Sequence, residues 1–380
     1  MLKSPKIIVR VVTSNYCIPA HLHNTLTMIP SNCIFYVIGE QATLYKKDYP
    51  SINFIDIPLR RNFSFIYDLK SFFLLIYFFI KIKPDIVHSL MTKAGLFTSI
   101  TAYITRVPIR IHTFTGQVWA NDQGFKRFLL KFVDKVICFL NSGCLTDSPS
   151  QSNFLFNNGI KFRGAKIPTL LNGSLSGVDL NKFNKESLTR ESSDFASELD
   201  ISSSDFVIAY IARKSLDKGC IDMLHIFLDV LKRYRVKLLF IGPDESNGEI
   251  KKVYDKYPDL KSNIIEYGFV NNHHIFLNIS NLLCLPSHRE GFGSIVIDAA
   301  ALGVPSVGYN IPGLSDSISD GYTGRLFDLG NKKGIADFIC HLISNRSLLN
   351  VYSKNAVKYV HENFNADLLN SELYSYYDKF

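Results

Sequence analysis

The stretch LPSHREGFGSIVIDAAALGVPSVGYNIPG, residues 285–313, carries the pattern that decides the fold. An apolar run ending at Leu285 is followed by Pro286 and a glycine-rich loop, and apolar residues then recur at helical spacing from Ser294 to Gly303. A second apolar run covers residues 305–309. The stretch therefore predicts a strand, a loop, a helix and another strand.

The loop itself predicts a ligand site. Gly291 and Gly293 let the backbone pass close to a ligand, and a helix start leaves amide groups free for an oxygen-rich or anionic partner. Glu290 lies in the loop, and Asp298 shares a helical face with Ser294, so one pocket can hold both acids. Such acids serve as metal ligands, as general acid and base, or as acceptors for sugar hydroxyls; an ordinary strand-to-helix crossover with a solvated Glu290 is the plain alternative. No further Asp, His or Cys follows at ligand spacing, which disfavours metal.

Length and charge limit the class of protein. A chain of 380 residues with 47% hydrophobic and 20% charged residues predicts two globular domains. Residues 1–165 carry 19 Lys and Arg against 8 Asp and Glu, and the remainder carries 23 against 26, so the first half is expected to meet an anionic partner. No nucleic-acid motif is present, and we expect no nucleic-acid partner. The seven cysteines form no C-x-x-C pair, as for buried thiols in a reducing compartment.

Apolar runs alternating with helical patterns predict parallel sheets covered by helices, a doubly wound α/β architecture. In the first half the predicted strands are residues 7–12, 34–38, 53–57, 86–88, 109–113 and 136–139. The expected division is a first domain over 1–170, a linker and exposed segment over 171–205, and a second domain over 206–363.

Residues 63–83, FSFIYDLKSFFLLIYFFIKIK, form an unusually aromatic helical segment. Its uninterrupted apolar core is shorter than the ~20 residues that span a bilayer, so it is not a transmembrane helix. Either the helix packs on the sheet or its outer face rests in a lipid interface. Aromatic residues on every face favour peripheral membrane contact.

Two further loops carry cations beside predicted helix starts. Arg213 and Lys218 precede Gly219 after an apolar run, and Lys93 follows the run that ends near His88. Ligands collect at this edge of doubly wound sheets, and both cations and helix N-termini attract phosphate.

Together these motifs resemble glycosyltransferase family 4, the retaining GT-B enzymes, as found in bacterial capsule and O-antigen synthesis. PSHREGFG, the second acid, ALGVP, NIPG and DGYTG occur in the family's order. The resemblance implies two doubly wound domains facing across a cleft, a C-terminal segment over 364–380 that crosses back to the first domain, and a nucleotide-sugar donor, expected to be a UDP-sugar, with no cofactor and no metal. It also implies donor binding by the second domain through Arg213, Lys218, Gly219, Glu290, Gly291, Phe292, Gly293, Ser294 and Asp298, with Glu290, Arg213 and Lys218 as the catalytic set.

Three positions depart from the family pattern. Asp298 stands where relatives usually have Glu, and the loop after the first strand, residues 13–16, lacks glycine. Thr115 occupies the place of a histidine that contacts the donor sugar, and we expect Thr115 to hydrogen-bond to that sugar instead. His112 lies three residues earlier on the opposite face of its strand, and we expect it on the acceptor side.

Residues 91–95, MTKAG, resemble the TPKAG loop of members that act on lipid carriers. The resemblance implies that Lys93 binds a phosphate of a polyprenyl-diphosphate-linked saccharide acceptor. The predicted protein is a hexosyl- or N-acetylhexosaminyltransferase in the cytoplasm, peripheral on the inner face of the cytoplasmic membrane. The alternatives are a nucleotide-sugar 2-epimerase of similar fold and a non-catalytic protein that binds sugar nucleotides.

Overall fold

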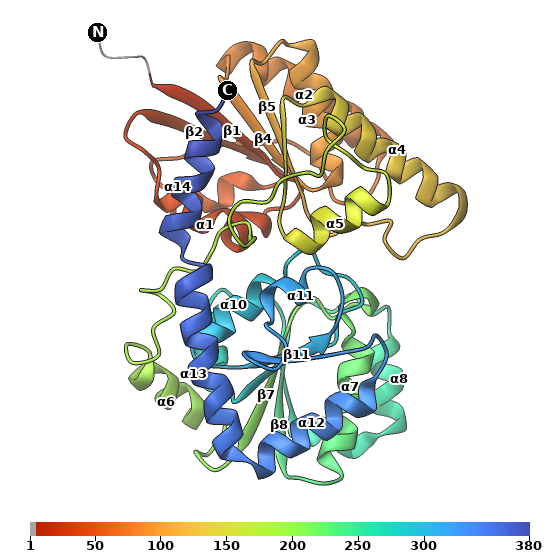
Figure 1. Ribbon diagram of the computed structural model, residues 1–380, viewed down its shortest axis with the longest axis vertical. Helices are drawn as coiled ribbons and strands as arrows, with labels where there is room; N and C mark the ends of the chain where they lie inside the picture. Colours follow the sequence, from red (N-terminus) through yellow and green to blue (C-terminus); the bar gives the residue numbers. More distant parts are fainter. Residues whose placement is uncertain (1–4) are drawn as a thin grey trace. The chain divides into compact units, whose positions relative to one another are not determined.

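The computed structural model describes residues 5–380 and divides into two compact units (Figure 1). Unit 1 comprises Met1–Gly177 and Ala366–Phe380, and unit 2 comprises Val178–Asn365. Each unit is built on a parallel sheet, and within residues 5–380 each sheet has six strands. Both are doubly wound, as the alternating sequence pattern predicted.

The sheet of unit 1 has the strand order β3-β2-β1-β4-β5-β6. Its strands are β1 (Lys6–Val11), β2 (Cys33–Gly39), β3 (Asn53–Asp56), β4 (Ile86–Leu90), β5 (Ile109–Phe114) and β6 (Gly143–Thr146). Its helices are α1 (His23–Thr27), α2 (Phe65–Ile82), α3 (Thr92–Ile104), α4 (Gly124–Leu140), α5 (Pro149–Asn157) and α14 (Ala366–Tyr377).

Alternation along β1 separates the two faces of this sheet. Ile8 joins a buried cluster with α1 and α14, whereas Val9 and Val11 pack with Leu75 of α2 and the inner side of α3. The last helix, α14, thus packs on the unit formed by the first half of the chain (Figure 1).

One predicted strand is wrong. Residues 136–139 lie inside α4, and the strand that follows is β6 (Gly143–Thr146). The apolar run that suggested a strand continues the helical spacing of Leu130 and Val133, and only Ile137 and Cys138 of the run are buried. A short apolar run in isolation does not distinguish a buried strand from one turn of a helix.

The sheet of unit 2 has the order β12-β11-β10-β7-β8-β9. Its strands are β7 (Phe206–Ile211), β8 (Val236–Ile241), β9 (Ile264–Tyr267), β10 (Leu282–Leu285), β11 (Ser306–Tyr309) and β12 (Gly324–Phe327). The helices are α6 (Thr189–Glu198), α7 (Cys220–Leu231), α8 (Glu249–Lys256), α9 (His273–Asn278), α10 (Ser294–Ala301), α11 (Leu314–Ser317), α12 (Lys332–Ser344) and α13 (Arg346–Asn363). The opening stretch of sequence folds as predicted, into β10, α10 and β11.

The central strands of unit 2 are the most deeply buried. β7 and β10 pair in parallel, and most of their side chains belong to one large apolar cluster that also includes residues of α7 and α10. Because β7 and β10 are neighbours, the loops at their carboxyl ends meet at one edge of the sheet. This edge carries the candidate site.

No helix within residues 5–380 combines the length and the apolar character needed to cross a bilayer. The aromatic segment predicted over 63–83 forms α2, whose buried residues include Leu75 and Phe79.

Candidate active site

Gly219 brings the loops after β7 and β10 into contact. Its φ of +68° lies in the left-handed region, and a Cβ at this position would lie 1.8 Å from the carbonyl oxygen of Pro286. The Tyr210 hydroxyl, reaching out from β7, lies 2.9 Å from the carbonyl oxygen of Arg213 and 3.1 Å from that of Lys218. The first loop is therefore held at both ends and pressed onto the second.

Lys218 and Glu290 form an ion pair across this contact. The Nζ of Lys218 lies 2.6 Å from Oε2 of Glu290, and their side chains are only 18% and 10% exposed. The hydroxyl of Ser287 donates to the other oxygen of Glu290 at 2.9 Å. Shielding from water strengthens the pair and fixes both side chains before any ligand arrives.

Asp217 connects two arginines from the two loops. Its Oδ2 lies 2.8 Å from a guanidinium nitrogen of Arg289 and 3.4 Å from one of Arg213, and its Oδ1 accepts from the Ser215 hydroxyl at 2.5 Å. Burial alone would raise the pKa of Asp217, but the Ser215 hydrogen bond and the charges of Arg213, Arg289 and Lys218 lower it to about 2. Asp217 is therefore a fixed anion between three cations.

Arg213 has a second carboxylate partner, Glu245, from the loop after β8. Three neighbouring strands, β10, β7 and β8, thus contribute loops to one charged cluster at the carboxyl edge of the sheet. An arginine fork and a compact lysine charge in such a cluster suit the oxygens of a diphosphate.

The glycine loop before α10 is packed from both sides. Gly293 has a φ of +80°, and a Cβ on Gly313 would lie 2.5 Å from the carbonyl oxygen of Gly291, so the NIPG loop rests directly on it. Phe292 is buried, with its ring 5.2 Å from that of Phe364. Its side chain belongs to the core, which leaves the backbone of this loop for the predicted donor contact.

Asp298 lies on the second turn of α10, and its carboxylate pairs with His273 of α9 at 3.2 Å. The helix begins at Ser294, immediately after the glycine loop. The structure thus brings Lys218 into direct contact with Glu290 and links Arg213 to the same loop through Asp217 and Arg289. Gly219 lies against Pro286 of that loop, and Asp298 lies on the helix that follows it.

The predicted residues of unit 1 have different surroundings. The Nζ of Lys93 lies 2.8 Å from the carbonyl oxygens of both Arg60 and Asn62 and 2.5 Å from Oδ1 of Asp68, so it ties the start of α2 to α3. Thr115 follows β5, and its carbonyl oxygen accepts from the Gln117 side chain at 2.7 Å.

His112 is fully buried. Its Nδ1 lies 2.9 Å from the Ser89 hydroxyl, and a Cβ on Gly95 would lie 2.4 Å from the imidazole, so α3 covers the ring. Burial lowers its pKa to about 3, which keeps it neutral. The acceptor contact predicted for His112 finds no support in this geometry.

Sequence reasoning did not single out Asp217, Arg289, Glu245 or His273 as site residues. Asp217 lies inside the same motif as Arg213 and Lys218, and Arg289 immediately precedes Glu290. Their positions next to predicted site residues could therefore have identified both. The pairing between them spans 72 residues of chain, and only the parallel arrangement of β7 and β10 reveals it.

Comparison of the sequence with known proteins identifies the family of this chain. The family described as "Glycosyl transferases group 1" matches residues 192–359. A capsular polysaccharide biosynthesis glycosyltransferase, CapM of Staphylococcus aureus, is 34% identical over 325 residues, which cover 85% of this chain and 84% of the relative. This chain belongs to the group 1 glycosyltransferases.

A second relative of this glycosyltransferase is the UDP-Gal:alpha-D-GlcNAc-diphosphoundecaprenol alpha-1,3-galactosyltransferase of Escherichia coli, 25% identical over 340 residues and 84% of each chain. Among solved structures, sucrose-phosphate synthase from Thermosynechococcus elongatus superposes with a TM-score of 0.82 at 16% identity, covering 98% of both chains. HepE of Anabaena in complex with UDP gives 0.76 at 16% identity, covering 99% of this chain and 100% of that one. The fold of the enzyme is GT-B, as the motifs predicted.

Proposed function

We propose that this glycosyltransferase moves a hexosyl or N-acetylhexosaminyl group from a UDP-sugar to a polyprenyl-diphosphate-linked saccharide, with retention of anomeric configuration, in surface polysaccharide synthesis. The observation that carries the donor half is the cluster of Arg213, Lys218 and Glu290 at the edge of unit 2. The acceptor half is supported by the E. coli relative, whose name specifies a diphosphoundecaprenol-linked substrate.

The proposed roles follow from the chemistry of each group. Arg213 and Lys218 bind the diphosphate, which gains negative charge as it leaves, and in a water-poor site that stabilisation is large. The bond from the anomeric carbon to the diphosphate breaks, a bond to the acceptor hydroxyl oxygen forms, and the hydroxyl proton is released with UDP. Glu290 accepts from sugar hydroxyls, and Asp298, beside His273, accepts from the ribose. We expect the two cations to serve without a metal ion.

The proposal also places α2 on the inner face of the cytoplasmic membrane. Phe65, Phe73 and Tyr77 of this helix are 70%, 60% and 53% exposed. The helix has one acid, Asp68, and it is buried against Lys93. An aromatic outer surface without carboxylates suits an anionic lipid interface.

The test measures UDP release from a panel of UDP-sugars with and without a polyprenyl-diphosphate-linked saccharide. Arg213→Ala and Lys218→Ala should each lower transfer by about tenfold or more, whereas Lys252→Ala, which removes an exposed cation paired with Glu249, should not. Wild-type rates in both site variants would disprove the diphosphate assignment.

Three further readouts complete this test. NMR of the product gives the anomeric configuration, and activity retained in EDTA would support metal-free transfer. Conversion of a UDP-sugar to its 2-epimer without acceptor would identify an epimerase instead.

A further inference from the structure

Helix α4 (Gly124–Leu140) is apolar on the side that faces solvent as well as on the side that faces the core. Its inner residues Ile137 and Cys138 are buried in a cluster with Trp119. Phe125, Phe128 and Phe132 on the outer side are 78%, 66% and 55% exposed, and Phe139 near its end is 83% exposed. These outer phenylalanines recur three, four and seven residues apart, so they form one stripe along the helix. A helix that only covered a sheet would carry polar residues there.

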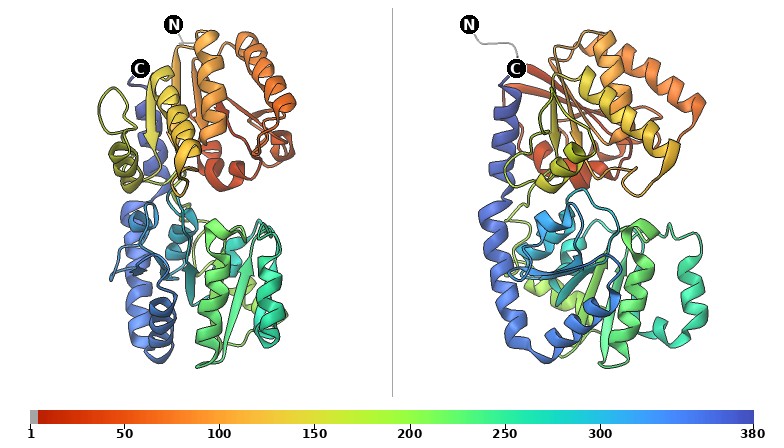
Figure 2. Two further views of the ribbon diagram at one scale, coloured as in Figure 1. Left: turned by 90° about the vertical axis from the view of Figure 1, so that its right-hand side faces the viewer. Right: turned by 45° about the vertical axis from the view of Figure 1, so that its right-hand side comes forward.

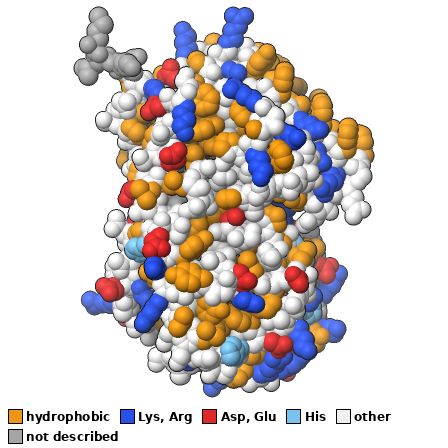
Figure 3. All heavy atoms as spheres, in the orientation of Figure 1, with side chains coloured by type: hydrophobic (Ala, Val, Ile, Leu, Met, Phe, Trp, Pro, Cys, Tyr) orange, Lys and Arg blue, Asp and Glu red, His pale blue; other side chains and the backbone are white. Residues whose placement is uncertain are grey.

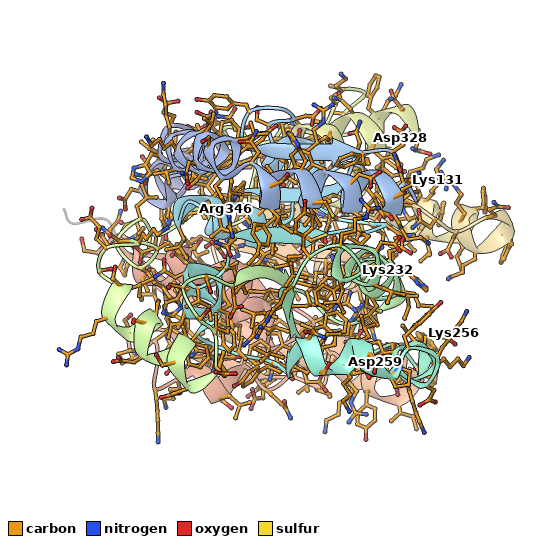
Figure 4. All side chains as sticks on the ribbon, turned by 90° about the horizontal axis from the view of Figure 1, so that it is seen from below. Lys131, Lys232, Lys256, Asp259, Asp328 and Arg346 are labelled. Carbon is orange, nitrogen blue, oxygen red and sulfur yellow. The ribbon has the colours of Figure 1, made fainter. Side chains whose placement is uncertain are left out.

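The charges on α4 are of one sign at its surface. Lys126, Lys131 and Lys135 lie between the outer phenylalanines in sequence, and Lys131 is labelled on this helix in Figure 4. The one acid of α4, Asp134, is fully buried and accepts a 2.6 Å hydrogen bond from the Trp119 indole. The outer surface of α4 therefore presents cations and aromatic rings without a carboxylate of its own.

The cations of α4 also crowd one another. A surface groove is lined by Gly124, Arg127, Phe128, Lys131, Phe132 and Lys135. Desolvation, followed by the charges of Arg127 and Lys135, lowers the pKa of Lys131. An anionic surface laid against this groove would relieve that repulsion.

The stripe on α4 belongs to the same side of unit 1 as the exposed aromatic residues of α2. Helix α3 contacts both α2 and α4, so the three form one layer (Figure 2). Near the end of α3, Tyr103 and Ile104 are each 55% exposed. Figure 3 shows hydrophobic side chains intermixed with Lys and Arg over this layer.

We propose that the outer stripe of α4, formed by Phe125, Phe128, Leu129, Phe132 and Phe139 with Lys126, Lys131 and Lys135, is a second membrane-docking surface that binds an anionic phospholipid bilayer. Aromatic rings at the headgroup level and Lys side chains beside lipid phosphates are the two contributions that peripheral helices use. The inference deepens the proposed function and rests on it for its purpose, since a lipid-linked acceptor requires an enzyme at the bilayer. Two docking helices would fix the orientation of unit 1 on the membrane, which a single helix does not.

Flotation with vesicles of phosphatidylglycerol and phosphatidylcholine, without any acceptor, tests the proposal. The variant Phe125→Ser, Phe128→Ser, Phe132→Ser keeps α2 intact and changes only exposed side chains. Its partition coefficient should fall about tenfold or more. The matched control Leu329→Ser, Val351→Ser, Leu368→Ser removes three apolar side chains of similar exposure outside this layer and should bind as the wild type does.

A charge variant separates the two contributions. Lys126→Gln, Lys131→Gln, Lys135→Gln keeps the aromatic stripe, and it should lose most of the salt-sensitive binding to anionic vesicles. UDP affinity, measured by calorimetry, should be unchanged in every variant, because Arg213, Lys218 and Asp298, the residues predicted to bind the diphosphate and the ribose, belong to unit 2. That readout separates a failure of the donor proposal from a failure of this one.

Three results would overturn the inference. The first is wild-type protein that does not float with anionic vesicles, and the second is equal flotation of the wild type and the phenylalanine variant. The third is a wild type that self-associates in light scattering through α4, with flotation unaffected by the variant, because the stripe would then join two copies of the chain.

Discussion

At the scale of single residues, Asp217 shows how the site is organised by a group that sequence reasoning overlooked. Each of its oxygens is engaged, Oδ1 by the Ser215 hydroxyl and Oδ2 by the guanidinium groups of Arg213 and Arg289. The cations that the motif identified are therefore oriented by an acid that the motif did not. The sequence shows which charged residues a loop contains, but not which of their side chains contact one another.

Asp217→Asn should raise the KM for the UDP-sugar by about tenfold while changing kcat less, because Asn holds the two arginines without charge. Steady-state kinetics and UDP calorimetry give the two numbers, and Asp217→Glu should restore part of the affinity. Asp229→Asn, in an exposed pair with Lys232, is the matched control. Unchanged UDP affinity in Asp217→Asn would show that the acid orients nothing that the donor uses.

The burial of His112 makes the stability of the fold depend on pH. Its pKa is lowered by burial to about 3, below the usual 6.5, so the unfolded chain takes up a proton first as the pH falls. Stability is therefore full above about pH 6.5 and is lost towards pH 3, at about 1.4 kcal/mol per pH unit for this histidine. His88, also buried beside Arg10, has a lowered pKa and acts in the same direction.

Urea unfolding of wild type and His112→Asn between pH 7.5 and 4.5 measures this dependence. The variant should be less stable at neutral pH, since it loses packing under α3, but its stability should fall less steeply with acid. Parallel pH profiles for the two proteins would mean that His112 does not titrate as its burial requires.

At the scale of elements, the spacing of apolar residues and the residues that begin and end helices predict most of the helices and strands. Ser148-Pro149 opens α5, where the Ser148 hydroxyl accepts from the Gln151 amide, and the glycine loop opens α10. The predicted strand at 136–139 was wrong because its length suits either element and its burial depends on which neighbours surround it. The exposed stripe of α4 was likewise not predicted, because the sequence alone does not show which apolar face of the helix packs on the core and which faces solvent.

Gly219 and Gly248 offer a matched pair for the contact between the two site loops. Both have positive φ, +68° and +87°, but a Cβ meets the Pro286 carbonyl at Gly219 and nothing within 4 Å at Gly248. Each substitution to Ala should cost about 1–2 kcal/mol of backbone strain. Gly219→Ala should cost more than Gly248→Ala in urea unfolding and should also reduce transfer. Equal stability and equal activity in the two variants would show that the loops tolerate being pushed apart.

At the scale of the whole molecule, the last residues of the chain pack in the unit formed by its first half. Helix α14 packs in unit 1, where the Tyr377 hydroxyl lies 2.7 Å from Nδ1 of His88 and 3.1 Å from a guanidinium nitrogen of Arg10. All three side chains are buried, so unit 1 cannot complete its core without the last residues of the chain. The predicted donor residues of the glycine loop and the Arg213 loop, by contrast, all belong to unit 2.

This division predicts that two perturbations act on different units. Tyr377→Phe removes one hydroxyl from the buried group and should destabilise unit 1 by about 1–3 kcal/mol, whereas UDP at a hundred times its Kd should stabilise unit 2 by about 2.7 kcal/mol. Hydrogen exchange followed by mass spectrometry reports both, with faster exchange expected in β1, β4 and α14 for the variant and slower exchange in the loops after β7 and β10 with UDP. Thr115 of unit 1 is predicted to contact only the sugar, which UDP lacks. If UDP protected unit 1 as strongly as unit 2, the assignment of the UDP-binding residues to unit 2 alone would be wrong.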